Sequence, residues 1–441
     1  MTILATELKP TCDASITHSN DDDYHTGFMA SSPLLRLPSP WDEWEAILDA
    51  AVQKKLQLGD KPDLTVAEEN ASKQWRGDVR KMNTLSVAGL EKSEATLQRA
   101  HVVLTYILHF YIQTLPVSEP ILVPRTISIP LLYVSQLLEV PPVITYADSV
   151  LNNWEYIIWP QKTSERPAAD NLRSQTTFTG LVDEHEFNLV SARIEFLGSD
   201  AVKLIALMMD QLAVGDSDAT KQITEHLRQL AGVIYAMKDA LLDVMKRCNP
   251  DVFYNQVRPW LRGEDSAATV RKWKFEGIDE HPDLRQPQYL SGPSAGQSCL
   301  IHSLDAFFGI DHGASNHGST SLMTRMQEYM PKKHREFLNN IKMSPRPLRN
   351  FVLASVDACI LAEFNHAVAA LKAFRDAHMI IITFFVLGPA RRAEKKDQAG
   401  HPSNVGNDPI KGTGGTDLVK FLKETRAHTT AAMIDTNRKM D

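Results

Sequence analysis

The pattern of hydrophobic and polar positions changes along the chain from irregular to strongly helical. Residues 1–33 are polar and acidic and predict a disordered or loosely docked leader. A helical pattern begins near Trp41, and another helix is expected at 93–114. The segment 121–154 alternates proline-bounded extended pieces with short helical ones, so a few strands are possible there. The Ser-, Thr- and Pro-rich stretch 160–180 predicts a linker or a long loop.

Long helical patterns dominate from residue 186 onward. Two extended core helices are expected first, and a Gly/Ser-rich turn at 289–298 opens a further helix. Later helices are expected at 332–343, 350–387 and 417–437. No internal repeat is visible.

These elements predict a mainly α protein with two domains. A smaller, mixed N-terminal domain is expected at 34–178, after the leader. A large, nearly all-helical C-terminal domain is expected at 179–441.

One histidine stands in some of the most apolar sequence of the chain, FRDAHMIIITFFV at 374–386. On a helix, His378 shares a stripe with the apolar residues Leu371, Phe374, Ile381, Ile382 and Phe385. His378 should therefore point into the protein, where an imidazole needs a partner. A core histidine bonded to a carbonyl or carboxylate is several times more common than a haem ligand, so periodicity alone favours the core histidine over the haem ligand.

Charge and cysteine usage narrow the class of protein. The net charge is −7 and the pI is near 6.1, which argues against a nucleic-acid binder. The four cysteines are far apart, so a thiolate zinc site or a disulfide framework is not expected. No apolar run is long enough to span a bilayer, and no targeting signal is visible. We expect a soluble, cytoplasmic protein that binds neither nucleic acid nor membrane.

Common catalytic templates fit poorly. The HPD at 281–283 matches a fragment of non-haem iron ligand sets, but it lies in a helical, proline-containing stretch. The GTGGTD at 412–417 lacks the lysine of a phosphate-binding P-loop. No HExxH or Gly-x-Ser-x-Gly motif is present, which leaves no support for a hydrolase.

Several longer segments, taken in order, resemble a fungal-type member of the indoleamine 2,3-dioxygenase family. The most specific combination is GPSAGQS at 292–298, the FRDAH helix and GTGGTD. The similar segments extend over about residues 85–430 and include PPVITYADSVLNNW, EFNLVSARIEF, DVFYNQVRPWL and YMPKKHREFL. The resemblance implies a haem enzyme that opens the indole ring of tryptophan, with haem b as cofactor and O2 as co-substrate.

On the proximal side of the haem, the resemblance assigns three residues. His378 matches the iron ligand, and Asp305 matches the acidic residue that orients its free ring N–H. Arg375, one turn earlier, matches the arginine that pairs with a haem propionate. Ser294 and Ala295 match residues beside the haem edge.

On the substrate side, the resemblance assigns a pocket, and Arg258 in it should pair with the substrate carboxylate. Pro259 disfavours helical geometry at Arg258 and places it at a helix end. Phe187 and Ser191, four residues apart, should share one helix face. The matched pocket residues are Tyr146, Phe187, Ser191, Phe253, Tyr254, Arg258, Ser294 and Ala295, with Gly412 and Thr413 in a loop that closes over the substrate amino group.

Two positions depart from the family pattern. Pro293 stands where some members have glycine, which stiffens the turn before Ser294. Tyr254 stands where phenylalanine occurs in others, which adds a hydroxyl near the substrate carboxylate.

The implied reaction is cleavage of the indole C2–C3 bond of L-tryptophan by O2 to give N-formylkynurenine, without a protein acid or base. It implies an external reductant, and we expect a monomer. Alternatives are another indole derivative as substrate, or a haem-binding or signalling protein with little catalysis.

Overall fold

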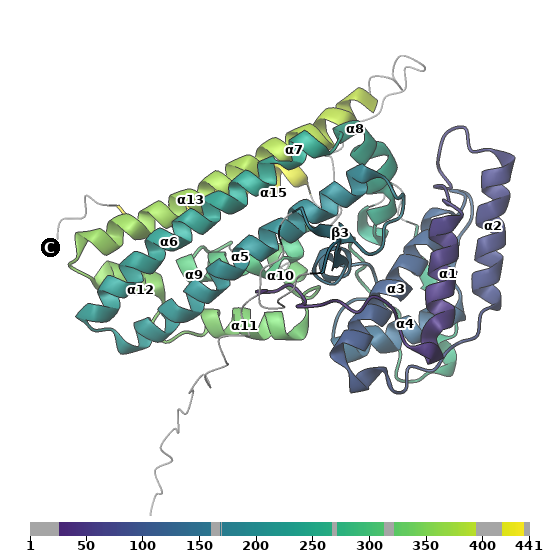
Figure 1. Cartoon of the computed structure of the whole chain (residues 1–441), viewed down its shortest axis with the longest axis horizontal. Coiled ribbons are helices and arrows are strands. Elements are labelled where there is room, and N and C mark those ends of the chain that lie inside the picture. Colours follow the sequence, from purple (N-terminus) through teal and green to yellow (C-terminus); the bar gives the residue numbers. More distant parts are fainter. Residues whose placement is uncertain are drawn as a thin grey trace, which may run out of the picture.

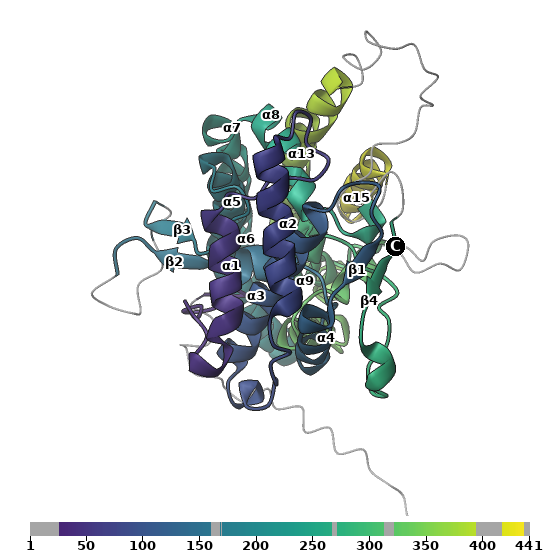
Figure 2. The ribbon, with the colours of Figure 1, turned by 90° about the vertical axis from the view of Figure 1, so that its right-hand side faces the viewer.

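The computed structural model describes residues 26–159, 168, 170–266, 271–312, 322–393 and 417–435. Within these residues the chain is mainly α-helical, as the sequence predicts, and its strands are short. The helices of the first part are α1 (Asp42–Gln53), α2 (Val66–Lys81), α3 (Glu94–Gln113) and α4 (Arg125–Leu138). These four helices lie together at one end of the molecule (Figures 1 and 2).

The start of each of two helices follows from its capping residue. Ser93 accepts a hydrogen bond from the backbone N–H of Thr96, so α3 begins where the sequence predicts. Thr65 and Glu68 form a reciprocal capping box at the start of α2. Helix α3 is buried on nearly all sides, and it is the centre of the first group of helices.

The strands form two small pairs. Strand β1 (Ile121–Val123) runs parallel to β4 (Trp273–Phe275), and β2 (Trp154–Tyr156) runs antiparallel to β3 (Leu172–Ser174). Strand β1 therefore lies within 121–154, where a few strands are expected, whereas β2 begins at the last residue of that segment. Strand β3 lies within 160–180, which is expected to be a linker or a long loop. The β1–β4 pair joins segments about 150 residues apart, which fixes the chain around residue 273 against the first group of helices.

Three long helices form the second part of the molecule. Helices α5 (Val182–Val214), α6 (Ser217–Leu242) and α13 (Ala358–Ile382) pack side by side, with α6 against both of the others (Figure 1). Gly215, at a φ of +70°, ends α5, and Asp216 then caps α6 through the backbone N–H of Ala219.

The helix expected over 350–387 is interrupted. Helix α12 (Leu348–Ala354) ends before α13, whose N-cap Asp357 accepts a hydrogen bond from the backbone N–H of Cys359 at 2.8 Å. The prediction of one continuous helix is therefore wrong at 355–357. The final helix α15 (Leu418–Ala431) is shorter than predicted and packs against α13.

Shorter elements connect these helices. The α-helical ones are α7 (Val244–Arg247), α8 (Pro250–Val252), α9 (Cys299–Phe308), α10 (Leu322–Gln327) and α11 (Lys332–Lys342). Three π-helical turns are η4 (Ala147–Leu151), η5 (Phe253–Val257) and η10 (Thr383–Leu387). The 3-10 turns are η2 (Ser39–Trp41), η3 (Leu90–Lys92), η6 (Arg258–Leu261), η7 (Glu264–Ser266), η8 (Ile278–Glu280) and η9 (Ala295–Gln297).

The buried apolar side chains gather in two large clusters. One is built mainly on α1 to α4, and the other on α5, α6, α9 and α13. Phe187 on α5 packs against both clusters. Packed structure begins before residue 34, because Phe28 and Met29 are buried, and the Phe28 ring lies 4.7 Å from that of His334.

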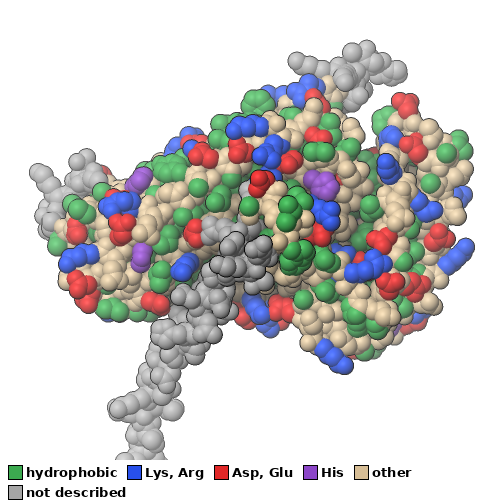
Figure 3. Space-filling view, in the orientation of Figure 1, with side chains coloured by type: hydrophobic (Ala, Val, Ile, Leu, Met, Phe, Trp, Pro, Cys, Tyr) green, Lys and Arg blue, Asp and Glu red, His purple; other side chains and the backbone are tan. Residues whose placement is uncertain are grey.

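The surface carries both signs of charge. On the face shown in Figure 3, Lys and Arg side chains are interspersed with Asp and Glu, and no basic stripe stands out. This agrees with the acidic net charge. Across the described ranges, no helix is both long and apolar enough to cross a membrane.

Candidate functional site

A largely apolar cavity of about 240 Å³ lies where the long helices meet the turns that follow them. Its walls come from α5, from α13 with η10, from η5 and η6, from the turn at 293–298 and from α15. Of the residues that the sequence assigns to a site, Tyr146, Phe187, Ser191, Phe253, Arg258, Ser294, Ala295 and His378 line this cavity.

Helix α5 contributes one wall through its helical periodicity. Phe187 and Ser191, four residues apart, both face the cavity, as predicted, and Glu195 lies one turn further on. The Phe187 ring stacks on that of Phe253, with centroids 4.0 Å apart and planes at 30°. The Phe253 ring also meets Phe385 edge-on, at 5.9 Å. An aromatic wall of this kind suits a flat, apolar ligand.

A buried carboxyl group forms the polar part of the cavity. The hydroxyl groups of Tyr146 and Ser298 donate to Glu195 Oε1 at 3.0 and 2.6 Å. Burial raises the pKa of Glu195 to about 7, although the two hydroxyls oppose the shift. Burial and the nearby Glu195 also raise the pKa of Tyr146 well above its ordinary value.

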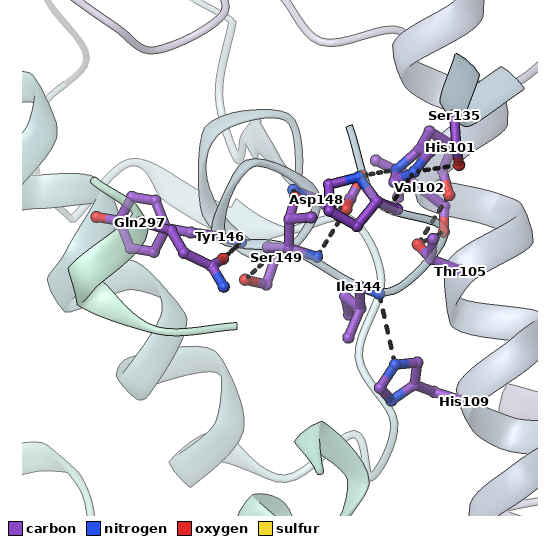
Figure 4. A network of polar contacts seen from close by, with 12 residues as sticks. His101, Val102, Thr105, His109, Ser135, Ile144, Tyr146, Asp148, Ser149 and Gln297 are labelled. Atoms are coloured by element: carbon purple, nitrogen blue, oxygen red, sulfur yellow. Dashed lines mark hydrogen bonds and ion pairs between the residues drawn. The ribbon is translucent and has the colours of Figure 1, made fainter. Parts of the chain in front are cut away.

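Helix α3 holds the segment that carries Tyr146 (Figure 4). His101 Nδ1 lies 2.7 Å from Asp148 Oδ1, and Asp148 Oδ2 accepts hydrogen bonds from the backbone N–H and the hydroxyl of Thr145. The backbone N–H of Tyr146 donates to Gln297 Oε1 at 2.8 Å. The pocket tyrosine is therefore fixed from the α3 side and from the turn after Ser294.

A second histidine of α3 links this segment to the one that carries Arg258. His109 Nδ1 lies 2.8 Å from the carbonyl oxygen of Trp260, and the backbone N–H of Ile144 donates to His109 Nε2 at 3.4 Å. Because the carbonyl oxygen can only accept and the backbone N–H can only donate, the ring proton of His109 must be on Nδ1. Burial lowers the pKa of His109 to about 4, so the ring is neutral.

Arg258 lies at the junction of η5 and η6. It has α-helical backbone angles despite Pro259, so the prediction of non-helical geometry there is wrong, whereas the placement at an element boundary is confirmed. Its guanidinium carbon lies 5.4 Å from the centre of the Tyr254 ring. Burial lowers the pKa of Arg258. Tyr254 contacts this arginine but does not line the cavity.

His378 lies on α13 and faces the cavity together with Phe374, Ile381 and Phe385. The apolar stripe predicted from the sequence is thus confirmed. Burial first, and the charge of Arg375 second, lower the pKa of His378 to about 4, so its imidazole is neutral. A neutral imidazole is the form that binds a metal.

Asp305 and Arg375 pair with each other beneath this wall. Arg375 Nη2 donates to Asp305 Oδ1 and Oδ2 at 2.5 and 2.7 Å, and His312 Nε2 lies 2.7 Å from Oδ2. Arg375 also donates to the hydroxyl of Thr429 on α15. Burial alone would raise the pKa of Asp305, but the charges of Arg375 and His312 outweigh it and lower the pKa.

This pairing differs from the arrangement that the resemblance implies. The Asp305 carboxylate is held by Arg375 and His312, and no hydrogen bond joins it to His378 among the described residues. Neither Asp305 nor Arg375 lines the cavity. Their assigned functions beside a haem stay predictions.

The turn at 292–298 supplies Ser294 and Ala295 to the cavity, and their assigned position beside a haem stays a prediction. Ser294 caps η9 through the backbone N–H of Gly296, and Gln297 Nε2 donates to the carbonyl oxygen of Gly292 at 2.9 Å. Gly412 and Thr413, assigned to the closing loop, lie outside the described residues.

The sequence reasoning missed four polar residues of the cavity. They are Ser149, Asn188, Glu195 and Ser298. Three of them had a local signal: Asn188 and Glu195 lie at helical spacing from Ser191, and Ser298 ends the SAGQS turn. A single glutamate in a helix is more often exposed to solvent, so helical spacing alone does not identify Glu195 as a residue of the cavity.

The residues of the cavity fit a haem. Among the described ranges, no group of three or more His, Cys, Asp and Glu side chains could hold a bare metal ion. His378 instead offers one neutral nitrogen on the wall of an apolar cavity, and a porphyrin brings its own four ligands to iron. A single neutral donor on the wall of an apolar cavity between helices is an arrangement by which haem-binding proteins hold iron, and the chain fits that class.

Within that class, the chain belongs to the indoleamine 2,3-dioxygenase family, whose model matches residues 19–432. The enzymes of this family are haem-dependent dioxygenases that use O2 and act on indole substrates.

Relatives of the chain cover nearly its whole length. It is 30% identical to indoleamine 2,3-dioxygenase 1 of Mus musculus, over 95% of each chain. It is also 30% identical to indoleamine 2,3-dioxygenase of Saccharomyces cerevisiae, over 92% of this chain and 91% of the yeast protein. A relative from Fusarium equiseti, 29% identical over 92% of this chain and 96% of its own, is named 6-hydroxytryptophan 2,3-dioxygenase.

Proposed function

We propose that the protein cleaves the indole C2–C3 bond of L-tryptophan with O2 to give N-formylkynurenine. The observation that carries the proposal is that one cavity joins His378, as a neutral nitrogen donor, to Arg258, as a cation, across aromatic walls. A substrate that has a flat indole ring and a carboxylate matches these two features.

In this proposal, His378 would hold a haem through a ring nitrogen, and Ser294 and Ala295, which line the same cavity, would contact it. The chemistry that haem supplies when bound is the binding and activation of O2. Arg375 is assigned to a propionate, for which its guanidinium would have to be shared with Asp305. Asp305 would then act on His378 only through Arg375.

The chain itself binds and orients the substrate. Arg258 pairs with the substrate carboxylate, because a guanidinium offers two parallel N–H donors. The stacked rings of Phe187 and Phe253 form an apolar wall and exclude water from the indole. Ser191 is a poor base, so it shapes the pocket and supplies a hydrogen bond rather than abstracting a proton.

Further parts of the proposal concern the surroundings of the reaction. Gly412 and Thr413 would close over the substrate amino group, and an external reductant would keep the iron ferrous. We propose a cytoplasmic monomer. The domain limits 34–178 and 179–441 and the leader 1–33 stay predictions.

The purified protein tests the proposal through its absorption spectrum and its turnover. Haem-loaded protein should show a Soret band, and with ascorbate, a redox mediator and L-tryptophan it should form N-formylkynurenine. His378→Ala should abolish or strongly shift the band. His366→Ala is the matched control, because His366 lies on α13 but is exposed and pairs with Glu363. Failure to bind haem at all would overturn the proposal.

Two other candidates predict different results in the same assay. An indole derivative other than tryptophan is suggested by the name of the Fusarium relative. It would give poor turnover of tryptophan and good turnover of the derivative. A haem-binding or signalling protein would give an intact Soret band and no product from any indole.

A further inference from the structure

One polar side chain of the cavity, that of Asn188, has no hydrogen-bond partner in the part of the chain that the structure describes. Asn188 lines the cavity with 6% of its surface exposed, and its amide makes no hydrogen bond to any described residue. The amide atoms face the cavity rather than being enclosed by protein, so an apolar occupant that covered them would cost free energy by removing their contact with water without replacing it. The amide of Asn188 therefore suits a polar group of whatever occupies the cavity.

Asn188 belongs to a polar strip along α5. Ser191 and Glu195 follow it at three and seven residues, which places all three on one helix face, and all three line the cavity. The Glu195 carboxyl already accepts hydrogen bonds from Tyr146 and Ser298. Around this strip the lining is apolar, with Phe187 and Val190 on the same helix. The strip thus offers a local hydrogen-bonding position within an apolar surface.

The chemistry of the amide indicates which group it would bind. An asparagine side chain both donates and accepts, and a hydroxyl group does the same, so the two can pair in either sense. In the proposed function the substrate carboxylate goes to Arg258, so the indole ring is the part that faces the α5 wall. A tryptophan ring has no polar substituent on its six-membered part, and it would leave the amide unpaired.

We propose that Asn188, with Ser191 beside it, is a subsite for a hydroxyl group on the six-membered part of the indole ring. Ring-hydroxylated tryptophans are then better substrates of this protein than tryptophan. The inference rests on the proposed function. The ring hydroxyl takes no part in the reaction, so bond cleavage and electron balance are those of tryptophan.

The first experiment compares substrates that differ at one ring position. The haem-loaded protein is assayed with L-tryptophan and with analogues that carry a hydroxyl or a methyl group at the same ring carbon. We expect kcat/KM to be about tenfold higher for at least one hydroxylated analogue than for tryptophan and for its methyl counterpart, as one hydrogen bond gives. A methyl group is similar in size to a hydroxyl group but forms no hydrogen bond, so the methyl analogues show how much of the preference is due to size alone.

The second experiment removes the amide. Asn188→Leu keeps the branching and the number of heavy atoms of the side chain but removes its hydrogen-bonding groups, and it should lower kcat/KM for the hydroxylated analogue about tenfold relative to that for tryptophan, which abolishes the preference. Asn340→Leu is the matched control, because Asn340 is exposed on α11. Binding is measured separately, as the stabilisation of ferric protein by each analogue in thermal unfolding, where no turnover occurs.

The outcomes distinguish this inference from the proposed function. Turnover of tryptophan with no preference for any hydroxylated analogue overturns the subsite and leaves the proposed function standing. Equal losses for tryptophan and the hydroxylated analogue in Asn188→Leu also overturn it, because Asn188 would then bind a group that both share, such as the indole N–H. Absence of turnover with every indole overturns both.

Discussion

Arg375 donates to both carboxylate oxygens of Asp305, although the two residues lie 70 positions apart. The pair joins α13, which carries His378, to α9, and both side chains are less than 10% exposed. Arg375 also bonds to Thr429, so the same cation holds α15. The wall behind the proposed haem ligand is therefore fixed by one buried network.

Breaking that pair should destabilise the protein strongly. Asp305→Asn leaves a buried guanidinium without its counter-charge, and we expect a loss of about 3 kcal/mol in the free energy of unfolding. Urea unfolding followed by circular dichroism measures it. Lys246→Gln is the control, because Lys246 pairs with Asp243 at 2.7 Å on the surface and its loss should cost less than about 1 kcal/mol. Equal losses would contradict the structural importance of the buried pair.

Arg258 should act on substrate binding rather than on haem. Arg258→Ala should raise the KM for tryptophan about 30- to 100-fold, the effect of losing a charged hydrogen-bonded pair, with the Soret band unchanged. Arg262→Ala provides the control, since Arg262 lies one turn further on and pairs with Asp60 at 3.2 Å on the surface. Parallel loss of the haem spectrum and of substrate affinity would argue against a carboxylate-binding function.

The raised pKa of Glu195 should make the folded state less stable as pH rises. Between pH 4.5 and about 7 the folded protein holds a proton that the unfolded chain has lost, so stability falls across this interval by up to about 3 kcal/mol. Glu195→Gln should remove that part of the pH dependence. Denaturant unfolding at pH 5 and pH 8 measures the difference between variant and wild type. A variant with the wild-type dependence would show that Glu195 does not hold the proton.

His109 should contribute an opposite dependence at lower pH. Its pKa in the folded protein is about 4, against 6.5 for an ordinary histidine, so the unfolded chain takes up a proton first as pH falls. Stability should therefore fall from pH 6.5 toward pH 4, by on the order of 3 kcal/mol for this residue. His109→Gln, whose amide can still donate and accept, should reduce that loss. His366→Gln, at an exposed histidine, should leave the loss of stability at low pH unchanged.

Two glycines let the segment that carries Arg258 touch the turn that carries Ser294. A Cβ atom on Gly292 would lie 2.1 Å from the carbonyl oxygen of Leu261, and one on Gly263 would lie 2.2 Å from that of Leu290. Gly292→Ala should push the segment at Leu261 away from the turn at 292–298, because the added Cβ atom has no room. We expect the free energy of unfolding to fall by about 2 kcal/mol or more and the KM for tryptophan to rise.

The control variant, Gly232→Ala, is expected to raise stability rather than lower it. Gly232 lies on α6, where an added Cβ meets nothing within 4 Å. Gly232→Ala should stabilise the protein by up to about 1 kcal/mol, because alanine favours a helix more than glycine does. Thermal unfolding of the two variants compares them directly. Similar effects of the two substitutions would mean that the close approach at Gly292 is not required.

The sequence predicts those features of the site that depend on local spacing. Helical periodicity places His378 on an apolar face and puts Phe187 and Ser191 on one wall, and the structure confirms both. The break between α12 and α13 was not predictable in this way, because residues 355–357 contain neither glycine nor proline. The interruption depends on Asp357 as an N-cap.

Contacts between distant segments were beyond the reach of a pattern in one sequence. Arg375 was expected at a haem edge, and nothing local indicates that Asp305 would occupy its guanidinium. The same holds for His109, whose partner Trp260 lies 151 positions away. Asn188 lies at helical spacing from Ser191, but that spacing does not separate a residue that lines a cavity from one in the core, and only the structure shows that Asn188 lines the cavity.

Phe187 belongs to the cavity wall and at the same time packs against both hydrophobic clusters. A ligand that contacts this ring would therefore touch a residue shared by the two clusters, one of which includes α3. Amide hydrogen exchange should reveal coupling between the clusters, since occupation of the cavity would slow exchange in both clusters together. Slower exchange in one cluster alone would show that the shared ring does not transmit the effect of the ligand from one cluster to the other.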